Sequence, residues 1–180
     1  MPLKPWKILS SKHIYKNVRI DQCQLEDGKI IEGFVLDFEN DWVTVVALTP
    51  DHQVVMERQY RHGIRKTIIE IPGGVMDAED AGPLEAVRRE LLEETGYTSD
   101  HFIQVGKVPP NPANQTNFIH YFLALDARKV ADQNLDATEE IEVVLKPLDE
   151  VVCMARTGKL QHALQVSALF FALAYLKRIG

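Results

Sequence analysis

The stretch that decides the fold is Arg89-Glu90-Leu91-Leu92-Glu93-Glu94-Thr95-Gly96-Tyr97, in the middle of the chain. On a helix, Glu90, Glu93 and Glu94 stand at positions i, i+3 and i+4, so their three carboxylates project from one face. Like charges at this spacing repel one another and give a helix no structural advantage. A hard divalent cation such as Mg²⁺ or Mn²⁺ removes the repulsion, because it prefers clustered oxygen ligands. The spacing therefore predicts a metal site, and the alternative is an ordinary solvated helix with glutamate–arginine pairs.

The residues before this helix predict a sharp turn and then a helix start. Glu70-Ile71-Pro72-Gly73-Gly74-Val75-Met76-Asp77 is a short apolar stretch interrupted by Pro-Gly-Gly, and a polar loop follows it. Pro83 suits a first helical turn, where its missing N–H would have no intrahelical partner in any case. Gly96 is the residue type found most often just past a helix C-terminus. We therefore expect a helix that begins at Pro83 and stops before Gly96.

The run from Gly74 to Tyr97 resembles the signature of the Nudix hydrolases, G-x5-E-x7-R-E-U-x-E-E-x-G-U, in which U is a bulky aliphatic or aromatic residue. The second half of the signature is matched at every fixed position. The first half departs from it, because Asp80 stands where the family carries Glu, and eight residues rather than seven separate Asp80 from Arg89. Glu79 lies one position earlier, so the identity of the first acidic residue stays open between the two.

The resemblance implies an α/β fold, a Nudix α/β/α sandwich with a mixed sheet. Outside the signature the chain is similar to the ADP-ribose pyrophosphatases and related nucleoside diphosphate sugar hydrolases, in which an N-terminal antiparallel β-meander precedes the catalytic domain. We expect the meander in residues 1–40 and the catalytic domain in residues 41–180. The subgroup implies that the meander forms a homodimer, and the alternative is that it packs on its own domain.

Periodicity and turn residues predict the remaining elements. Apolar strands are expected at 43–48 and 54–58, joined as a hairpin by a turn at 51–52. The last helix is expected to pack through a stripe of Leu164, Ala168, Phe171 and Tyr175. The other expected elements are strands at 11–18, 20–25, 30–36, 67–71, 102–108, 117–125 and 141–145, and helices at 148–157 and 162–179.

For the metal centre, the resemblance implies that Glu90, Glu94 and the carbonyl of Gly73 hold the cation. Backbone carbonyls are ordinary ligands of hard cations. Glu93 and Glu94 are expected to be catalytic. Glu139, in an acidic loop before a strand, matches the region of a mobile catalytic carboxylate, and we favour it over Glu140.

For the substrate, the resemblance implies that Arg61 contacts the diphosphate, since a guanidinium pairs bidentately with phosphate. The alternative for Arg61 is a solvated strand end. Glu70 matches a position close to metal and substrate, and it can equally pair with an arginine on a neighbouring strand. Asn111 and Pro112 lie in an amide-rich loop that can read sugar hydroxyls or a base edge.

The composition fits a compact globular enzyme. A chain of 180 residues forms one domain or one domain with a small appendage. A net charge of −6 without a basic stripe argues against a nucleic-acid partner. The longest apolar run, 168–176, is too short to span a bilayer, and the N-terminus lacks the apolar core of a signal peptide. We expect a cytoplasmic protein with no membrane partner.

These features together predict a divalent-metal-dependent hydrolase that cleaves the diphosphate link of nucleoside diphosphate sugars such as ADP-ribose. The products would be a nucleoside monophosphate and a sugar phosphate. Two alternatives remain open at this point: a Nudix hydrolase of nucleoside triphosphates or RNA ends, and a non-catalytic Nudix ligand sensor. The three intact glutamates argue against the sensor.

Overall fold

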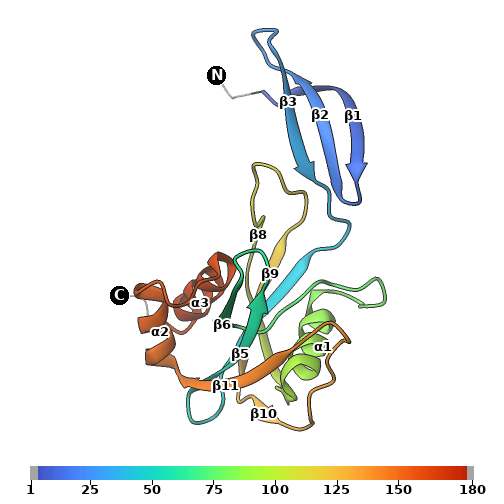
Figure 1. Cartoon of the computed structure of the whole chain (residues 1–180). Coiled ribbons are helices and arrows are strands. Elements are labelled where there is room, and N and C mark those ends of the chain that lie inside the picture. The colour runs from blue at the N-terminus through green and yellow to red at the C-terminus, as the bar shows by residue number, and fades with distance from the viewer. Residues whose placement is uncertain (1–3, 178–180) are drawn as a thin grey trace. The chain divides into compact units, whose positions relative to one another are not determined.

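The computed structural model describes residues 4–177, which fall into two compact units (Figure 1). The first unit comprises the residues up to Glu39 together with Pro109–Phe118, and the second comprises the rest of the chain from Asn40 onward. Within the described residues, no helix has the length and apolar character needed to cross a membrane. Each unit is described in turn below.

The first unit contains the expected antiparallel meander. Its strands are β1 (Lys7–Tyr15), β2 (Val18–Gln24) and β3 (Ile30–Leu36), in the order β1-β2-β3. The loop 109–118 belongs to this unit because it bonds to the end of β3. The Leu36 amide donates to the Asn114 carbonyl at 2.7 Å, and the Phe38 amide donates to the Thr116 hydroxyl at 2.9 Å.

The second unit contains two three-stranded sheets. In one sheet, β9 (Ile119–Leu125) lies between β4 (Trp42–Ala47), to which it is parallel, and β8 (His101–Val108), to which it is antiparallel. In the other, β5 (Gln53–Arg61) lies between β11 (Ile141–Pro147) and β6 (Lys66–Glu70), with both pairs antiparallel. A short pair, β7 (Tyr97–Thr98) with β10 (Arg128–Lys129), completes the strands.

The expected hairpin of 43–48 with 54–58 is wrong. The two strands exist, but β4 and β5 lie in different sheets and share only one isolated bridge, between Leu48 and Val54. The physical reason is that β4 is buried along nearly its whole length, as is β9. A strand that is buried on both faces typically pairs in parallel with another buried strand, as β4 does with β9. The short turn at 51–52 is therefore not sufficient to make β4 and β5 pair as a hairpin.

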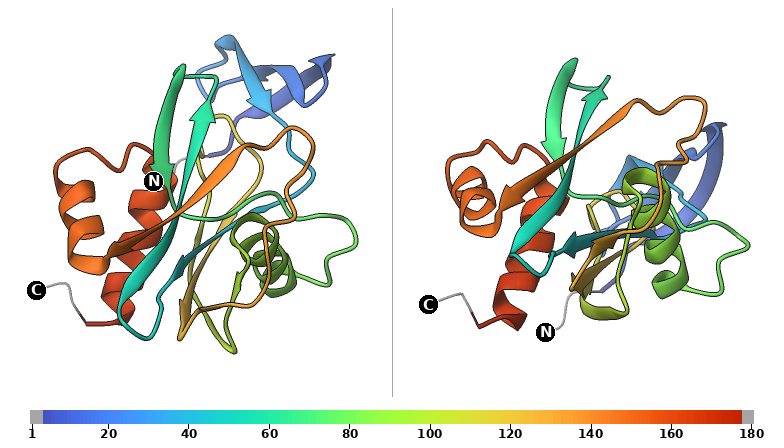
Figure 2. Two further views of the ribbon diagram at one scale, coloured as in Figure 1. Left: turned by 60° about the horizontal axis from the view of Figure 1, so that its bottom comes forward. Right: turned by 90° about the horizontal axis from the view of Figure 1, so that it is seen from below.

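The helices cover both faces of these sheets, as Figure 2 shows. Alternate residues of β4 explain this, because side chains along a strand point to opposite faces. Val43, Val45 and Ala47 pack with α1 (Pro83–Thr95), whereas Val46 packs with α2 (Leu148–Arg156) and α3 (Ala163–Tyr175). The predicted α/β class and sandwich arrangement are confirmed.

The predicted packing stripe of the last helix is partly wrong. Ala168 is buried and Leu164 and Phe171 are half-buried, but Tyr175 is 54% exposed. The buried positions of α3 are Gln165, Ala168, Leu169 and Ala172, which also follow helical spacing. Because α3 is apolar on nearly every side, its sequence alone did not show which face is buried. The buried face is centred about one residue away from the predicted one. The helix ends at Tyr175 rather than at 179, and part of the predicted end lies outside the described residues.

Candidate active site

Two signature glycines shape the site because no other residue fits at their positions. Gly96 follows α1 with a φ of 74°, and its amide donates to the Leu92 carbonyl at 2.8 Å. A Cβ on Gly96 would lie 2.1 Å from the Ala131 carbonyl oxygen, and a Cβ on Gly74 would displace the Glu90 carboxylate, which it would approach to 2.4 Å. The helix bounds and the C-terminal glycine cap predicted from the sequence are confirmed.

The loop and α1 enclose a pocket of about 330 Å³, which we call the acidic pocket. It brings together most of the residues predicted to be metal-binding or catalytic, and a predicted substrate residue, Arg61, lies on its wall. Glu140 does not line it. A larger hollow of about 660 Å³ lies elsewhere on this unit and contains no signature residue. The acidic pocket is lined by Gln59, Arg61, Gly73, Gly74, Val75, Asp77, Arg89, Glu90, Glu93, Glu94, Asn134, Asp136 and Glu139.

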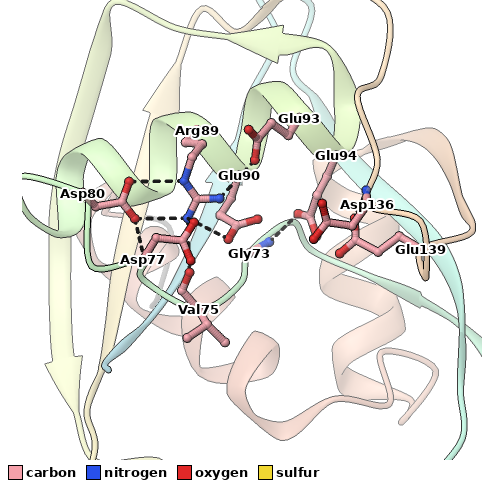
Figure 3. A network of polar contacts seen from close by, with 10 residues as sticks. All are labelled: Gly73, Val75, Asp77, Asp80, Arg89, Glu90, Glu93, Glu94, Asp136 and Glu139. Carbon is pink, nitrogen blue, oxygen red and sulfur yellow. Dashed lines mark hydrogen bonds and ion pairs between the residues drawn. The ribbon is translucent and has the colours of Figure 1, made fainter. Parts of the chain in front are cut away.

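Arg89 is the cationic centre of one half of this pocket (Figure 3). Its guanidinium lies 3.1 Å from Asp80 and 3.0 Å from Glu93, and it donates to the Val75 carbonyl at 3.2 Å. It also lies 3.2 Å from both Asp77 and Glu90. Arg89 therefore orients carboxylates through ion pairs.

Asp80, and not Glu79, occupies the position of the first acidic signature residue. Both oxygens of Asp80 accept hydrogen bonds from Arg89, and one also accepts from the Asp77 amide at 2.8 Å. The Arg89 guanidinium holds the pKa of Asp80 below its usual value. Glu79 is exposed. The extra loop residue thus compensates for the shorter side chain, because it lets an aspartate reach the arginine.

Glu90 and Glu94 have the opposite electrostatic character. Burial raises the pKa of Glu90 to about 7 and the pKa of Glu94 to about 8. The charge of Glu139 contributes to both raised pKa values, and its carboxylate lines the same pocket. Glu94 accepts a hydrogen bond from the Gly73 amide at 3.0 Å. Glu90 keeps one cationic partner, Arg89 at 3.2 Å, whereas the groups that act on Glu94 are the Gly73 amide and other carboxyl groups.

The loop that carries Glu139 is fixed to the end of α1. The Asn134 amide donates to the Glu93 carbonyl at 2.9 Å, and the Gln133 side chain donates to the Glu94 carbonyl at 2.6 Å. Figure 3 shows Asp136 and Glu139 beside Glu94, and the Glu139 carboxylate accepts from the Asp136 amide at 3.1 Å. A segment far from the signature in sequence thereby contributes an acidic wall of the pocket.

Glu57 is a site residue that the sequence reasoning missed. It lies on β5, is only 2% exposed, and shares a hydrogen bond with the Glu94 carboxyl group. Burial raises the pKa of Glu57 well above its usual range, and Glu94 adds to the shift. The available signal was a glutamate directly after three apolar residues of a predicted buried strand, 54–56.

Arg61 and Glu70 form an ion pair between β5 and β6, with 2.5 Å between the guanidinium Nε and Oε2. This is the alternative left open for Glu70, which is fully buried and does not line the acidic pocket. Gln165 of α3 accepts from the Ile71 amide at 2.8 Å and donates to the Ile71 carbonyl at 3.0 Å. The helix thus fixes the backbone that leads to Gly73.

A second pocket of about 270 Å³ adjoins the acidic pocket and shares four of its residues, Arg61, Gly73, Gly74 and Val75. Its walls are mainly apolar, with polar groups from α3 and from the residue before it. Asn111 and Pro112, predicted to bind substrate, belong to the first unit, where Asn111 caps a turn of the loop 109–118. The remaining residues of the second pocket are Trp42, Val43, Thr44, Ile71, Ile119, His162, Leu164 and Gln165.

The donor groups of the acidic pocket fit a hard divalent cation. They are oxygen atoms throughout, and Glu57 adds a buried oxygen without a hydrogen-bond partner. Within residues 4–177, no three His, Cys, Asp or Glu side chains converge closely enough to enclose an ion as they stand. The excess of buried carboxylate over cation on the Glu90–Glu94 side is the property that a metal would balance.

This fold and this signature helix define the class, the Nudix hydrolases. The family model described as "NUDIX domain" matches residues 40–169, and the chain belongs to that family. It is 27% identical to an ADP-ribose pyrophosphatase of Bacillus subtilis, over 87% of this chain and 83% of that one. It is also 27% identical to a GDP-mannose pyrophosphatase of Salmonella arizonae, over 91% of this chain and 90% of that one.

A solved structure titled "Crystal structure of ADP compounds hydrolase" shares the fold, with a TM-score of 0.87 over 100% of this chain and 98% of that chain, at 21% identity. With the second half of its signature intact and these relatives along nearly its whole length, the chain is a Nudix pyrophosphohydrolase.

Proposed function

We propose that this enzyme hydrolyses the diphosphate link of nucleoside diphosphate sugars such as ADP-ribose, and that Mg²⁺, or alternatively Mn²⁺, is its cofactor. The observation that carries the proposal is the acidic pocket, where the carboxyl groups of Glu90, Glu94 and Glu139 outnumber the cations and the guanidinium of Arg61 lies on the wall. The names of the two pyrophosphatase relatives support the substrate class.

The residues that would hold the cation are Glu90, Glu94 and the carbonyl of Gly73. When bound, a divalent cation neutralises a diphosphate and lowers the pKa of a water molecule. Arg61 faces the same pocket and is 43% exposed at its side chain, so it can bind a phosphate while it keeps its bond to Glu70. Arg89 is occupied by carboxylates and holds Glu93 in place.

Glu139 is the residue that we assign as the general base. Its carboxylate lines the acidic pocket, whereas Glu140 does not, and its charge acts on both Glu90 and Glu94. A base must lie within reach of the water whose proton it accepts. Glu93 remains the second catalytic candidate, since it lies on the same wall, with its side chain 39% exposed.

The organic half of the substrate would enter the second pocket, which continues from the acidic pocket past Arg61 and Gly73. Trp42, Ile119 and Leu164 give it apolar walls, and Gln165 gives it a polar group, the combination that binds a sugar or a base. Asn111 and Pro112 are kept as further substrate contacts from the first unit.

We further propose that the enzyme is a cytoplasmic homodimer formed through the meander of residues 1–40, with the catalytic domain in residues 41–180. Every residue of β1 is exposed, and apolar side chains such as Ile8, Ile14 and Phe34 are more than half exposed. A meander of three strands with so little core needs a partner surface. Light scattering on the purified protein would test this, and a monomer at all concentrations would contradict it.

The test of the function is hydrolysis of a panel: ADP-ribose, GDP-mannose, UDP-glucose, dinucleotides and nucleoside triphosphates. Each is assayed with Mg²⁺, with EDTA, and with Glu94→Gln protein. We expect metal-dependent release of a nucleoside monophosphate from the sugar nucleotides, lost in the variant. Turnover of triphosphates or RNA ends alone would move the enzyme to another Nudix branch, and tight binding without turnover would make it a sensor.

A further inference from the structure

Glu57 is the most unusual charged residue of the second unit. It is 2% exposed, and its Oε1 has no hydrogen-bond partner. Its cross-strand neighbours are Val143 on β11 and Glu70 on β6. A buried carboxyl group with an unpaired oxygen destabilises a fold, whereas a well-packed apolar residue at the same position would not.

The position of Glu57 on β5 directs it toward α1. Val55, two residues earlier, packs in the cluster of α1, whereas Val54 and Met56 pack in the opposite cluster. Residues two apart on a strand share a face, so Glu57 and Gln59 also face α1. Gln59 lines the acidic pocket, and Glu57 lies one step deeper, where it meets Glu94.

The two arginines of β5 are each paired with a carboxylate other than Glu57. Arg61 is bound to Glu70 at 2.5 Å, and Arg58 is bound to Glu142 at 2.7 Å. A purely structural role would be filled equally well by an apolar residue, as at Val55 on the same face of the strand. What distinguishes Glu57 from such a residue is its contact with the carboxyl group of Glu94.

We propose that Glu57 belongs to the metal centre as a positioning residue: from beneath the pocket, its carboxyl group holds Glu94 in the orientation that binds a divalent cation. The inference rests on the proposed function, because the cation is part of that proposal. It assigns a residue of β5, outside the signature, to the site. Supporting residues behind metal ligands typically contribute about 10- to 100-fold in metal affinity.

The experiment measures Mn²⁺ binding to metal-free protein at one fixed pH, by calorimetry and by the electron paramagnetic resonance of free Mn²⁺. The variants are Glu57→Gln and, as a matched control, Glu142→Gln, which removes one exposed glutamate charge from the neighbouring strand β11. We expect Glu57→Gln to weaken Mn²⁺ binding by about 10- to 100-fold, and Glu142→Gln to leave it unchanged.

Thermal melts provide a second measurement, and its expected result differs from that for a residue with a purely structural role. We expect metal-free Glu57→Gln protein to melt at the wild-type temperature or above it. On addition of Mn²⁺, its melting temperature should rise less than that of the wild type. A second variant, Glu57→Met, keeps the side-chain size and removes the charge, and the same results are expected for it. Wild-type affinity in Glu57→Gln, or loss of folding in both variants, would overturn the inference. Absence of Mn²⁺ binding to the wild type would instead overturn the proposed cofactor.

Discussion

The two ends of the acidic cluster at α1 differ in burial as well as in the presence of a cation. Asp80 is a half-buried residue of the loop before α1 and its pKa is lowered, whereas Glu94 is buried and burial raises its pKa to about 8. Arg89 accounts for the first, since it binds both oxygens of Asp80. The neighbour of Glu94 is another carboxyl group, Glu57. The ionised form of a carboxyl group is thus stabilised where a cation binds it and destabilised where its buried neighbour is another carboxyl group. The chain supplies the cation, Arg89, at the Asp80 end but not at the Glu94 end.

The largest expected effect lies at the end without a cation. Glu94→Gln keeps the shape of the side chain and its bond to Gly73, but it removes the charge that holds metal. We expect kcat/KM for sugar nucleotides to fall by about 10³-fold, equivalent to roughly 4 kcal/mol of transition-state stabilisation. The measurement is steady-state hydrolysis at saturating Mg²⁺, and a loss below about tenfold would contradict the assigned role.

At the Arg89 end the expected effect is on stability. Arg89→Ala leaves Asp80 buried without its partner, so we expect the free energy of unfolding to fall by about 3 kcal/mol. The free energy of unfolding of Arg89→Lys should lie between those of the wild type and Arg89→Ala, because lysine keeps the charge but lacks the planar fork that binds both oxygens of Asp80. Urea denaturation of metal-free protein measures both. If Arg89→Ala stayed within about 0.5 kcal/mol of the wild type, the ion pairs would not be structural.

The pH dependence of stability distinguishes Asp80 from the Glu90–Glu94 pair in the wild-type protein, without a substitution at either end. Because the folded pKa values of Glu90 and Glu94 are about 7 and about 8, the folded state holds more protons than the unfolded state above 4.5, the ordinary pKa of glutamate. The free energy of unfolding of metal-free protein should therefore fall as pH rises through that window, by about 2 kcal/mol or more. Asp80 acts in the opposite sense only below 3.8, its ordinary pKa.

His162 works against this trend, because burial lowers its pKa and its contribution to stability therefore rises with pH up to 6.5. The control is Glu94→Gln, which retains His162 and Asp80 and should show a flatter dependence. Urea midpoints at about pH 5 and about pH 8 provide the test. Stability that rose across this range in the metal-free wild type would contradict the buried state of the glutamates.

The smallest effect tests the identity of the first acidic residue. Asp80→Asn weakens a charged hydrogen bond to Arg89 and should lower the free energy of unfolding by about 1 kcal/mol. Glu79→Gln changes an exposed neighbour and should stay within about 0.5 kcal/mol. Both are measured by urea denaturation, and the reverse order of the two effects would assign the position to Glu79.

Much of the site was predictable because its signals are local. The three glutamates fix the acidic face of α1 by helical spacing alone, and Pro83 and Gly96 set its bounds. Glu57 was not predictable in this way, since a glutamate on a strand points to a site only when the residue opposite it is known. The same applies to Glu70, for which the sequence left two partners open and the β5–β6 register selects Arg61.

The sequence by itself determined the family and the signature helix, because these depend on residues within a few turns of each other. The tertiary structure decided which sheet receives β4, which face of α3 is buried, and that Asp80 rather than Glu79 reaches Arg89. It also decided that β5 places Glu57 behind Glu94. These outcomes depend on contacts between segments that are distant in the sequence. The spacing of residues within one segment does not show which other segment will pack against it.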